Sequence, residues 1–169
     1  MKKSILFLAV FALLVSFKDN ERKLPSVDIK TLDGKNVNSS TFSNDGKPII
    51  ISFWATWCSP CKKELNAISD VYSEWQKETG VKLIAISIDD SKSSTNVAPY
   101  VNSKGWEYEE YLDLNSDFKR AMNVNMPPHT FILDGKGNIV WQHVGFKDGD
   151  EEQYIEVVRK IIKGEPIEH

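Results

Sequence analysis

Residues 49–61 decide the fold, and they read Ile49-Ile50-Ile51-Ser52-Phe53-Trp54-Ala55-Thr56-Trp57-Cys58-Ser59-Pro60-Cys61. The first part is almost continuously apolar, which is typical of a strand covered on both faces of a sheet. From Ser59 to about Thr79 apolar residues recur at helical spacing, and Gly80 follows as a stop. A buried strand therefore leads directly into a helix, with Cys58 at the junction.

The segments on either side complete an α/β pattern. A second apolar run at 81–88 follows the helix, and two strands joined by such a helix form a right-handed parallel unit. Upstream, the turn dipeptide Asp33-Gly34 predicts a hairpin across 27–37. Downstream we expect a helix at 95–104, a strand at 108–114, a short helix at 117–122, an antiparallel hairpin at 129–144 and a final helix at 150–163. The pattern predicts a central mixed β-sheet flanked by helices, with an added N-terminal β-hairpin.

Composition and the first residues indicate one exported domain. The chain has 169 residues, of which 41% are hydrophobic, enough for a single core. Its net charge of -3, with both signs interspersed, gives no sign of nucleic-acid binding. Two lysines precede the apolar run 5–17, which ends in charged residues, as in an export signal. We expect a signal peptide or uncleaved membrane anchor at 1–17, a linker at 18–23, the domain at 24–164 and a tail at 165–169.

The two cysteines of the chain are placed for chemistry. A disulfide across three residues closes too short a loop to stabilise a fold. Cys58 falls at a helix N-terminus, where free N–H groups and the helix dipole favour a thiolate. Pro60 stiffens the first turn without losing a hydrogen bond. We interpret Cys58 as the exposed attacking thiolate, and Cys61, partly buried behind it, as the resolving thiol of a reversible disulfide.

Two motifs carry a resemblance to a known family. The run 53–65 resembles the active-site segment of the TlpA/ResA-like branch of the thioredoxin superfamily, which is related to the AhpC/TSA redoxins. The run 126–134 is similar to the cis-proline loop of that family and its following strand, and the resemblance extends over about 24–164. It implies a thioredoxin-like fold in which Pro128 is cis and faces the disulfide, with the backbone at Pro127 pairing with an extended substrate.

The resemblance also suggests roles for the residues around the cysteines. Trp57, Ser59 and Pro60 would border the substrate. Ordinary thioredoxins carry a buried aspartate at the position of Ser52, and that acid is absent here. Glu64 is the matching candidate, because a glutamate near the disulfide tunes the cysteine acidities in the ResA-like branch. An exposed helix glutamate with ordinary surface contacts is an equal alternative for Glu64.

The resemblance implies an enzyme, a thiol-disulfide oxidoreductase of the cell envelope or periplasm. It would take electrons from a membrane thiol reductase and reduce disulfides in exported proteins, among them apocytochromes c during cytochrome c maturation. We expect a monomer without cofactor or metal. The direction of electron flow comes from the resemblance alone.

Two other functions stay open at this point. A copper-binding assembly module would use the two thiolates and His129, because soft thiolates suit Cu(I). A thiol peroxidase of the peroxiredoxin group is disfavoured, since Ile51 and Ala55 stand where that site needs proline and threonine ahead of Cys58.

Overall fold

The computed structural model describes residues 22–167, which form a seven-stranded sheet with helices on both faces. The predicted export segment at 1–17 lies outside the described residues and stays a prediction. The strands are β1 (Asp28–Thr31), β2 (Asn36–Asn38), β3 (Ile49–Trp54), β4 (Lys82–Ser87), β5 (Glu109–Leu112), β6 (His129–Leu133) and β7 (Ile139–Val144); the helices are α1 (Ser59–Thr79), α2 (Val97–Lys104), α3 (Asp117–Ala121) and α4 (Asp150–Lys163). Short 3-10 turns lie at Ser39–Thr41 and Ser94–Asn96.

The strand β3 lies at the centre of the sheet, as its apolar sequence predicts, and every one of its residues is buried. The strand order is β2-β1-β5-β4-β3-β6-β7. The strands β3, β4 and β5 are parallel neighbours, while β6 and β7 pair antiparallel beside β3. The N-terminal hairpin joins the far side of the sheet, where β1 pairs antiparallel with β5. The predicted mixed sheet with an added hairpin is confirmed.

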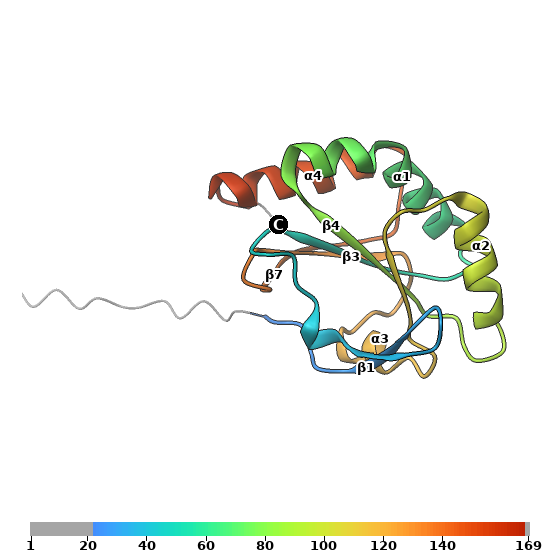
Figure 1. The fold of residues 1–169 in the computed structure, drawn as a ribbon. Coiled ribbons are helices and arrows are strands. Elements are labelled where there is room, and N and C mark those ends of the chain that lie inside the picture. Colours follow the sequence, from blue (N-terminus) through green and yellow to red (C-terminus); the bar gives the residue numbers. More distant parts are fainter. Residues whose placement is uncertain (1–21, 168–169) are drawn as a thin grey trace, which may run out of the picture.

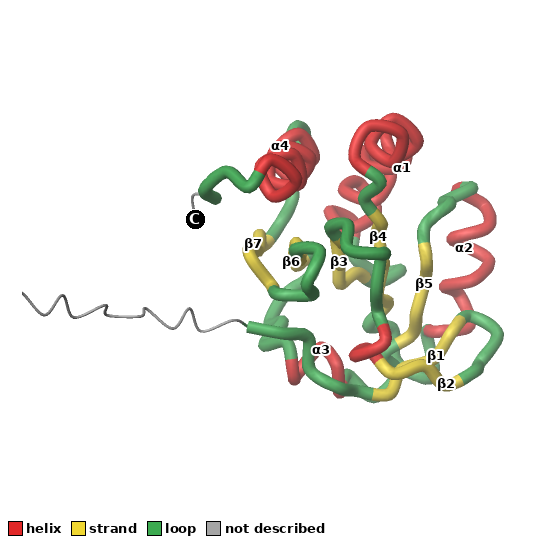
Figure 2. The backbone as a smooth tube through the Cα atoms, turned by 60° about the vertical axis from the view of Figure 1, so that its left-hand side comes forward, coloured by secondary structure: helices red, strands yellow, loops and turns green. Residues whose placement is uncertain are grey.

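The helices form two unequal layers (Figures 1 and 2). The helices α1, α2 and α4 lie over one face of the sheet, and α3 lies over the other. The connections through α1 and through α2 each lead to the next parallel strand in the same direction along the sheet. Because such crossovers are right-handed as a rule, their helices share one face. Side chains of β3 alternate accordingly: Trp54 packs against Trp106 near α2, whereas Phe53 packs against Phe118 of α3.

Most predicted boundaries hold, with differences at three places. Gly80, Gly105 and Gly164 end α1, α2 and α4 in the left-handed conformation that favours glycine. The strand β5 is shorter than the predicted 108–114, and α2 begins at Val97 after a 3-10 turn. Arg22, which we expected in the linker, accepts a hydrogen bond at its carbonyl from the N–H of Ile139. Among the described residues, no helix has the length and apolar character needed to span a membrane.

Candidate active site

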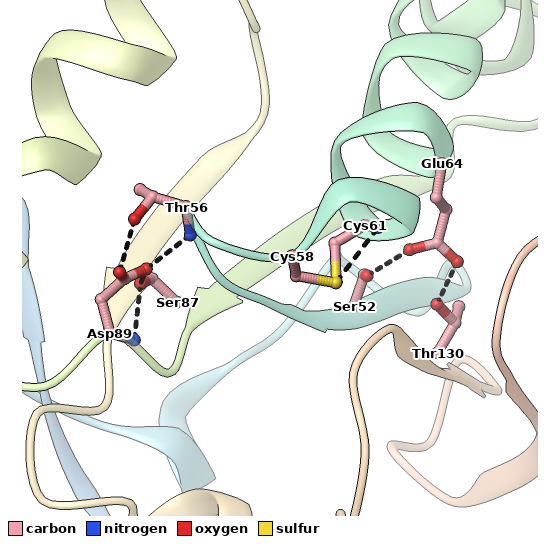
Figure 3. The surroundings of a disulfide bond; sticks show 8 residues. All are labelled: Ser52, Thr56, Cys58, Cys61, Glu64, Ser87, Asp89 and Thr130. Atoms are coloured by element: carbon pink, nitrogen blue, oxygen red, sulfur yellow. Dashed lines mark hydrogen bonds between the residues drawn. A yellow bond between two sulfur atoms is a disulfide. The ribbon is translucent and has the colours of Figure 1, made fainter. Parts of the chain in front are cut away.

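A disulfide between Cys58 and Cys61 lies where β3 ends and α1 begins (Figure 3). The two Cα atoms are 5.3 Å apart. Cys58 is the N-cap of α1, and its Sγ accepts the N–H of Cys61 at 3.3 Å. Pro60 occupies the first turn, which holds no acidic residue. The helix dipole and the free amides of this turn therefore act on the sulfur of Cys58 without a nearby anion in the turn to oppose them.

The two cysteines differ in exposure, but less than we expected. Cys58 is 6% exposed and Cys61 is fully buried. The order agrees with an attacking Cys58 and a resolving Cys61, whereas the expectation of an exposed Cys58 is wrong for the disulfide form. The reason is that its sulfur turns back over the first turn of α1, toward Cys61. Trp57, Ser59 and Pro60 around it are exposed.

A groove of about 440 Å³ lies between the first turn of α1 and the loop before β6. The peptide bond between Pro127 and Pro128 is cis. These two prolines and Pro60 line the groove together. The remaining lining residues are Met126, His143, Val144, Gly145, Phe146, Lys147 and Asp150. The structure thus brings Pro60, Pro127 and Pro128 to one groove next to the disulfide; Trp57 and Ser59 are not among its lining residues.

Glu64 is fully buried, so the alternative of an exposed helix glutamate is wrong. It lies one turn after Cys61 on the face of α1 that covers the sheet, and residues at this spacing are neighbours on a helix. Its Oε2 accepts a hydrogen bond from Ser52 Oγ at 2.7 Å. Its Oε1 accepts two more, from Thr130 Oγ1 and from the Tyr154 hydroxyl, each at 2.7 Å.

The ionisation of Glu64 is set by two opposing effects. Burial raises the pKa of Glu64, and the three hydroxyl groups lower it in part by stabilising the carboxylate. Figure 3 shows two of these hydrogen bonds, from Ser52 and Thr130. Glu64 therefore supplies a buried, titratable carboxyl group beside Cys61.

A second buried carboxylate, which the sequence analysis missed, holds the loop before Cys58. Asp89 is fully buried and accepts hydrogen bonds from the N–H of Thr56 at 2.8 Å and from its hydroxyl at 2.6 Å. The hydroxyl of Ser87 donates a third, at 2.9 Å (Figure 3). The sequence held one signal for this residue. Asp89 directly follows the apolar run at 81–88, and because parallel neighbouring strands end at the same edge of a sheet, it lies near the end of β3.

His129 does not lie with the cysteines. Side chains alternate along β6, so that Thr130 contacts Glu64 on the α1 face, while His129 stacks on Phe131 over the opposite face. Burial lowers the pKa of His129, which favours the neutral ring. Within residues 22–167, no three His, Cys, Asp or Glu side chains group in a way that could hold a metal. The arrangement that a copper-binding module would need is therefore not found there.

This fold and this site define a class of protein: a thioredoxin-like enzyme that carries a redox-active disulfide at a helix N-terminus, a thiol-disulfide oxidoreductase. The chain belongs to the AhpC/TSA family, whose model matches residues 21–142, and within it to the TlpA/ResA-like branch of the thioredoxin superfamily.

Individual relatives agree with this assignment. The chain is 30% identical to the thiol-disulfide oxidoreductase ResA of Bacillus subtilis, over 78% of this chain and 70% of that protein. It is 28% identical to the ResA of Bacillus thuringiensis, over 95% of this chain and 99% of that protein. It is 49% identical to a thioredoxin-like protein from Porphyromonas gingivalis, whose solution structure it matches with a TM-score of 0.76 over 89% of this chain and 99% of that one.

Proposed function

We propose that this enzyme reduces disulfides in exported proteins of the cell envelope. In the reduced form, the thiolate of Cys58 attacks one sulfur of a substrate disulfide, forming a mixed disulfide and releasing a substrate thiolate. The thiolate of Cys61 then attacks the Cys58 sulfur and releases the second substrate thiolate. Two electrons pass to the substrate, and the Cys58–Cys61 disulfide is re-formed. A dithiol of a membrane reductase returns two electrons to the chain.

The observation that carries this proposal is the buried Glu64 beside Cys61 at the helix N-terminus. Resolution of the mixed disulfide needs a deprotonated Cys61. Because Cys61 is fully buried, a nearby group must accept the proton of its thiol. Glu64 is placed one helical turn away and is held by hydrogen bonds. Its negative charge disfavours a second negative charge on the thiolate, which makes the dithiol a better electron donor.

The groove beside the disulfide is the proposed substrate site. Pro60, Pro127 and Pro128 line it, and Trp57 and Ser59 border the disulfide itself. Proline has no N–H, so Pro127 can accept a backbone hydrogen bond from an extended substrate but cannot donate one. Recognition then depends more on side-chain contacts in the groove than on pairing with the substrate backbone.

We further propose that the chain acts outside the cytoplasmic membrane, either after signal cleavage or held by its N-terminal segment. Arg22 contacts Ile139 at the start of β7, next to the end of β6. The register of β3 with β6 pairs Ile49 with Leu133, so Cys58 lies at the opposite end of β3 from Arg22. An anchored chain would therefore present its disulfide away from the membrane. Apocytochromes c, which carry a Cys-x-x-Cys-His motif, are the proposed substrate class.

The experiment that tests the proposal is the equilibrium reduction potential of the Cys58–Cys61 couple against glutathione or dithiothreitol, with Cys58→Ser as control. A value near or below about -270 mV supports a reductase. A value near about -120 mV identifies a disulfide-forming oxidant and overturns the direction of electron flow. For the substrate class, the reduced chain is mixed with an oxidised Cys-x-x-Cys-His peptide; a rate no higher than that of a scrambled disulfide peptide contradicts the proposed substrate.

A further inference from the structure

The Glu64 carboxylate is held by three hydroxyl groups that come from three different elements. Ser52 belongs to β3, Thr130 to β6 and Tyr154 to α4. The two shorter side chains reach Glu64 from strands directly beneath α1. Tyr154 is different, because it comes from the last helix, 90 positions along the chain from Glu64. Through this hydroxyl the C-terminal helix α4 contacts the carboxylate beside Cys61.

Tyr154 is placed as a donor and has little freedom to move. Its side chain is fully buried, and its ring packs edge-on against Trp141 and beside His143 of β7. Burial raises the pKa of Tyr154 above its ordinary value, so the hydroxyl keeps its proton and can donate it to Oε1 of Glu64.

The charged groups around this hydrogen bond are few. From β7, His143 faces the Tyr154 ring and contacts Asp150 at 3.2 Å, at the first turn of α4. The positive charge of His143, when protonated, lowers the pKa of Glu64 less than each of the three hydroxyl groups does. From the sheet side, Tyr108 keeps its proton because burial raises its pKa. From α1 itself, the neighbouring titratable group is the thiol of Cys61 in the reduced form.

We propose that Tyr154 is a positioning residue of the redox centre: its hydroxyl holds the Glu64 carboxylate in the ionised form beside Cys61 and so keeps the dithiol reducing. This inference deepens the proposed function and rests on it. Without the Tyr154 hydroxyl, the carboxylate loses one charge-assisted hydrogen bond. Among the described residues, Thr130 is then the remaining donor to Oε1 of Glu64. Glu64 then takes up a proton more readily, and the repulsion that disfavours the Cys61 thiolate weakens.

The test is the reduction potential of full-length Tyr154→Phe measured from about pH 5 to about pH 9, an interval that extends upward from the ordinary pKa of a glutamate, about 4.3. We expect the equilibrium constant with glutathione to shift threefold to tenfold toward the dithiol, a rise of about 15 to 30 mV. The shift is confined to the pH interval in which Glu64 titrates and vanishes where Glu64 is fully protonated or fully ionised in both proteins. A purely structural effect would shift the potential at every pH.

The matched control is Tyr72→Phe, which also removes one buried hydroxyl. Tyr72 lies on α1, but its hydroxyl accepts from the N–H of Leu83 and does not contact Glu64. The reduction potential of Tyr72→Phe should equal that of the unmodified chain. In a Glu64→Gln background, Tyr154→Phe should add no further shift, because the group through which it acts is gone.

Three results would overturn the inference: an unchanged potential in Tyr154→Phe, the same shift in the Glu64→Gln background, or an equal shift in Tyr72→Phe. Should Tyr154→Phe fail to fold by circular dichroism, Thr130→Val removes the other donor to the same oxygen and gives the same test. Failure of the proposed function is a separate outcome: the unmodified chain would then show no reversible couple or an oxidant's potential.

Discussion

Replacing Asp89 with alanine should loosen the loop that carries Cys58. The Asp89 carboxylate accepts two hydrogen bonds from Thr56, which lies two positions before Cys58, and a third from Ser87. Asp89 and Ser87 are fully buried. In Asp89→Ala these donors lose their acceptor, and water can reach only the half-buried Thr56.

The size of the effect follows from these contacts. A hydrogen bond to a charged group contributes about 1.5 to 3 kcal/mol net. The Asp89 carboxylate also regains hydration when the chain unfolds, so the contributions of the three bonds to the free energy of unfolding do not add fully. We expect Asp89→Ala to lower the free energy of unfolding by about 3 to 4 kcal/mol, near the usual cost of breaking a buried charged network. Thr56→Val, which loses the hydroxyl bond to the Asp89 carboxylate but keeps the N–H bond, should cost about 1.5 to 2 kcal/mol.

Two assays separate stability from function. Urea unfolding of the oxidised chain gives the free energies, and a thermal scan should show Asp89→Ala melting about 10 °C lower. The rate of disulfide exchange should fall about tenfold in Asp89→Ala, because the attacking sulfur is no longer held in one orientation. Two results would show that Asp89 does not hold this loop: a free energy of unfolding of Asp89→Ala within about 1 kcal/mol of the unmodified chain, or a larger loss in Thr56→Val than in Asp89→Ala.

Three further predictions concern the cysteines, a buried carboxyl group and the groove. Cys61→Ser should accumulate a mixed disulfide with substrate at Cys58, visible by mass spectrometry, because the resolving thiol is gone; accumulation in Cys58→Ser instead would reverse the assigned roles. Burial raises the pKa of Glu110 well above its ordinary value of 4.5, and within residues 22–167 Trp54 is its one hydrogen-bond donor. The stabilising contribution of the protonated Glu110 is therefore full below about pH 4.5 and is lost as the pH rises through the raised pKa. The melting temperature of Glu110→Gln should therefore fall less with rising pH than that of the unmodified chain. An equal dependence of the melting temperature on pH in the two proteins would contradict this. Met126 is 64% exposed and lines the groove. Met126→Ser should raise KM for a protein substrate about threefold, because apolar contact with the substrate is lost, and should leave the rate of reduction by dithiothreitol unchanged. An equal loss in both assays would show that Met126 supports the fold and not substrate binding.

Local sequence patterns determined much of this protein. The apolar run of β3, the helical spacing of α1 and the stops at Gly80, Gly105 and Gly164 each depend on residues close together in the chain. So does the placement of Cys58 at a helix N-terminus, which is the basis of the chemistry. These features follow from backbone preferences and hydrophobic periodicity, which act over a few residues and are readable without a structure.

Other features required the tertiary structure, because they join residues far apart in the chain. The sequence left the position of Glu64 undecided between surface and interior. Its burial depends on the covering of α1 by the sheet and by α4, which brings Tyr154 to the same carboxylate. The pairing of β1 with β5 and the contact of Asp89 with Thr56 are of the same kind.

The sequence by itself therefore determined the redox pair, the order of its elements and the class of fold. Only the tertiary structure decided which polar groups surround that pair: Ser52, Thr130 and Tyr154 at Glu64, and Thr56 at Asp89. The physical reason is that a buried carboxylate must find hydrogen-bond donors wherever packing brings them, and strand register and helix packing choose those donors without leaving a local pattern in the sequence.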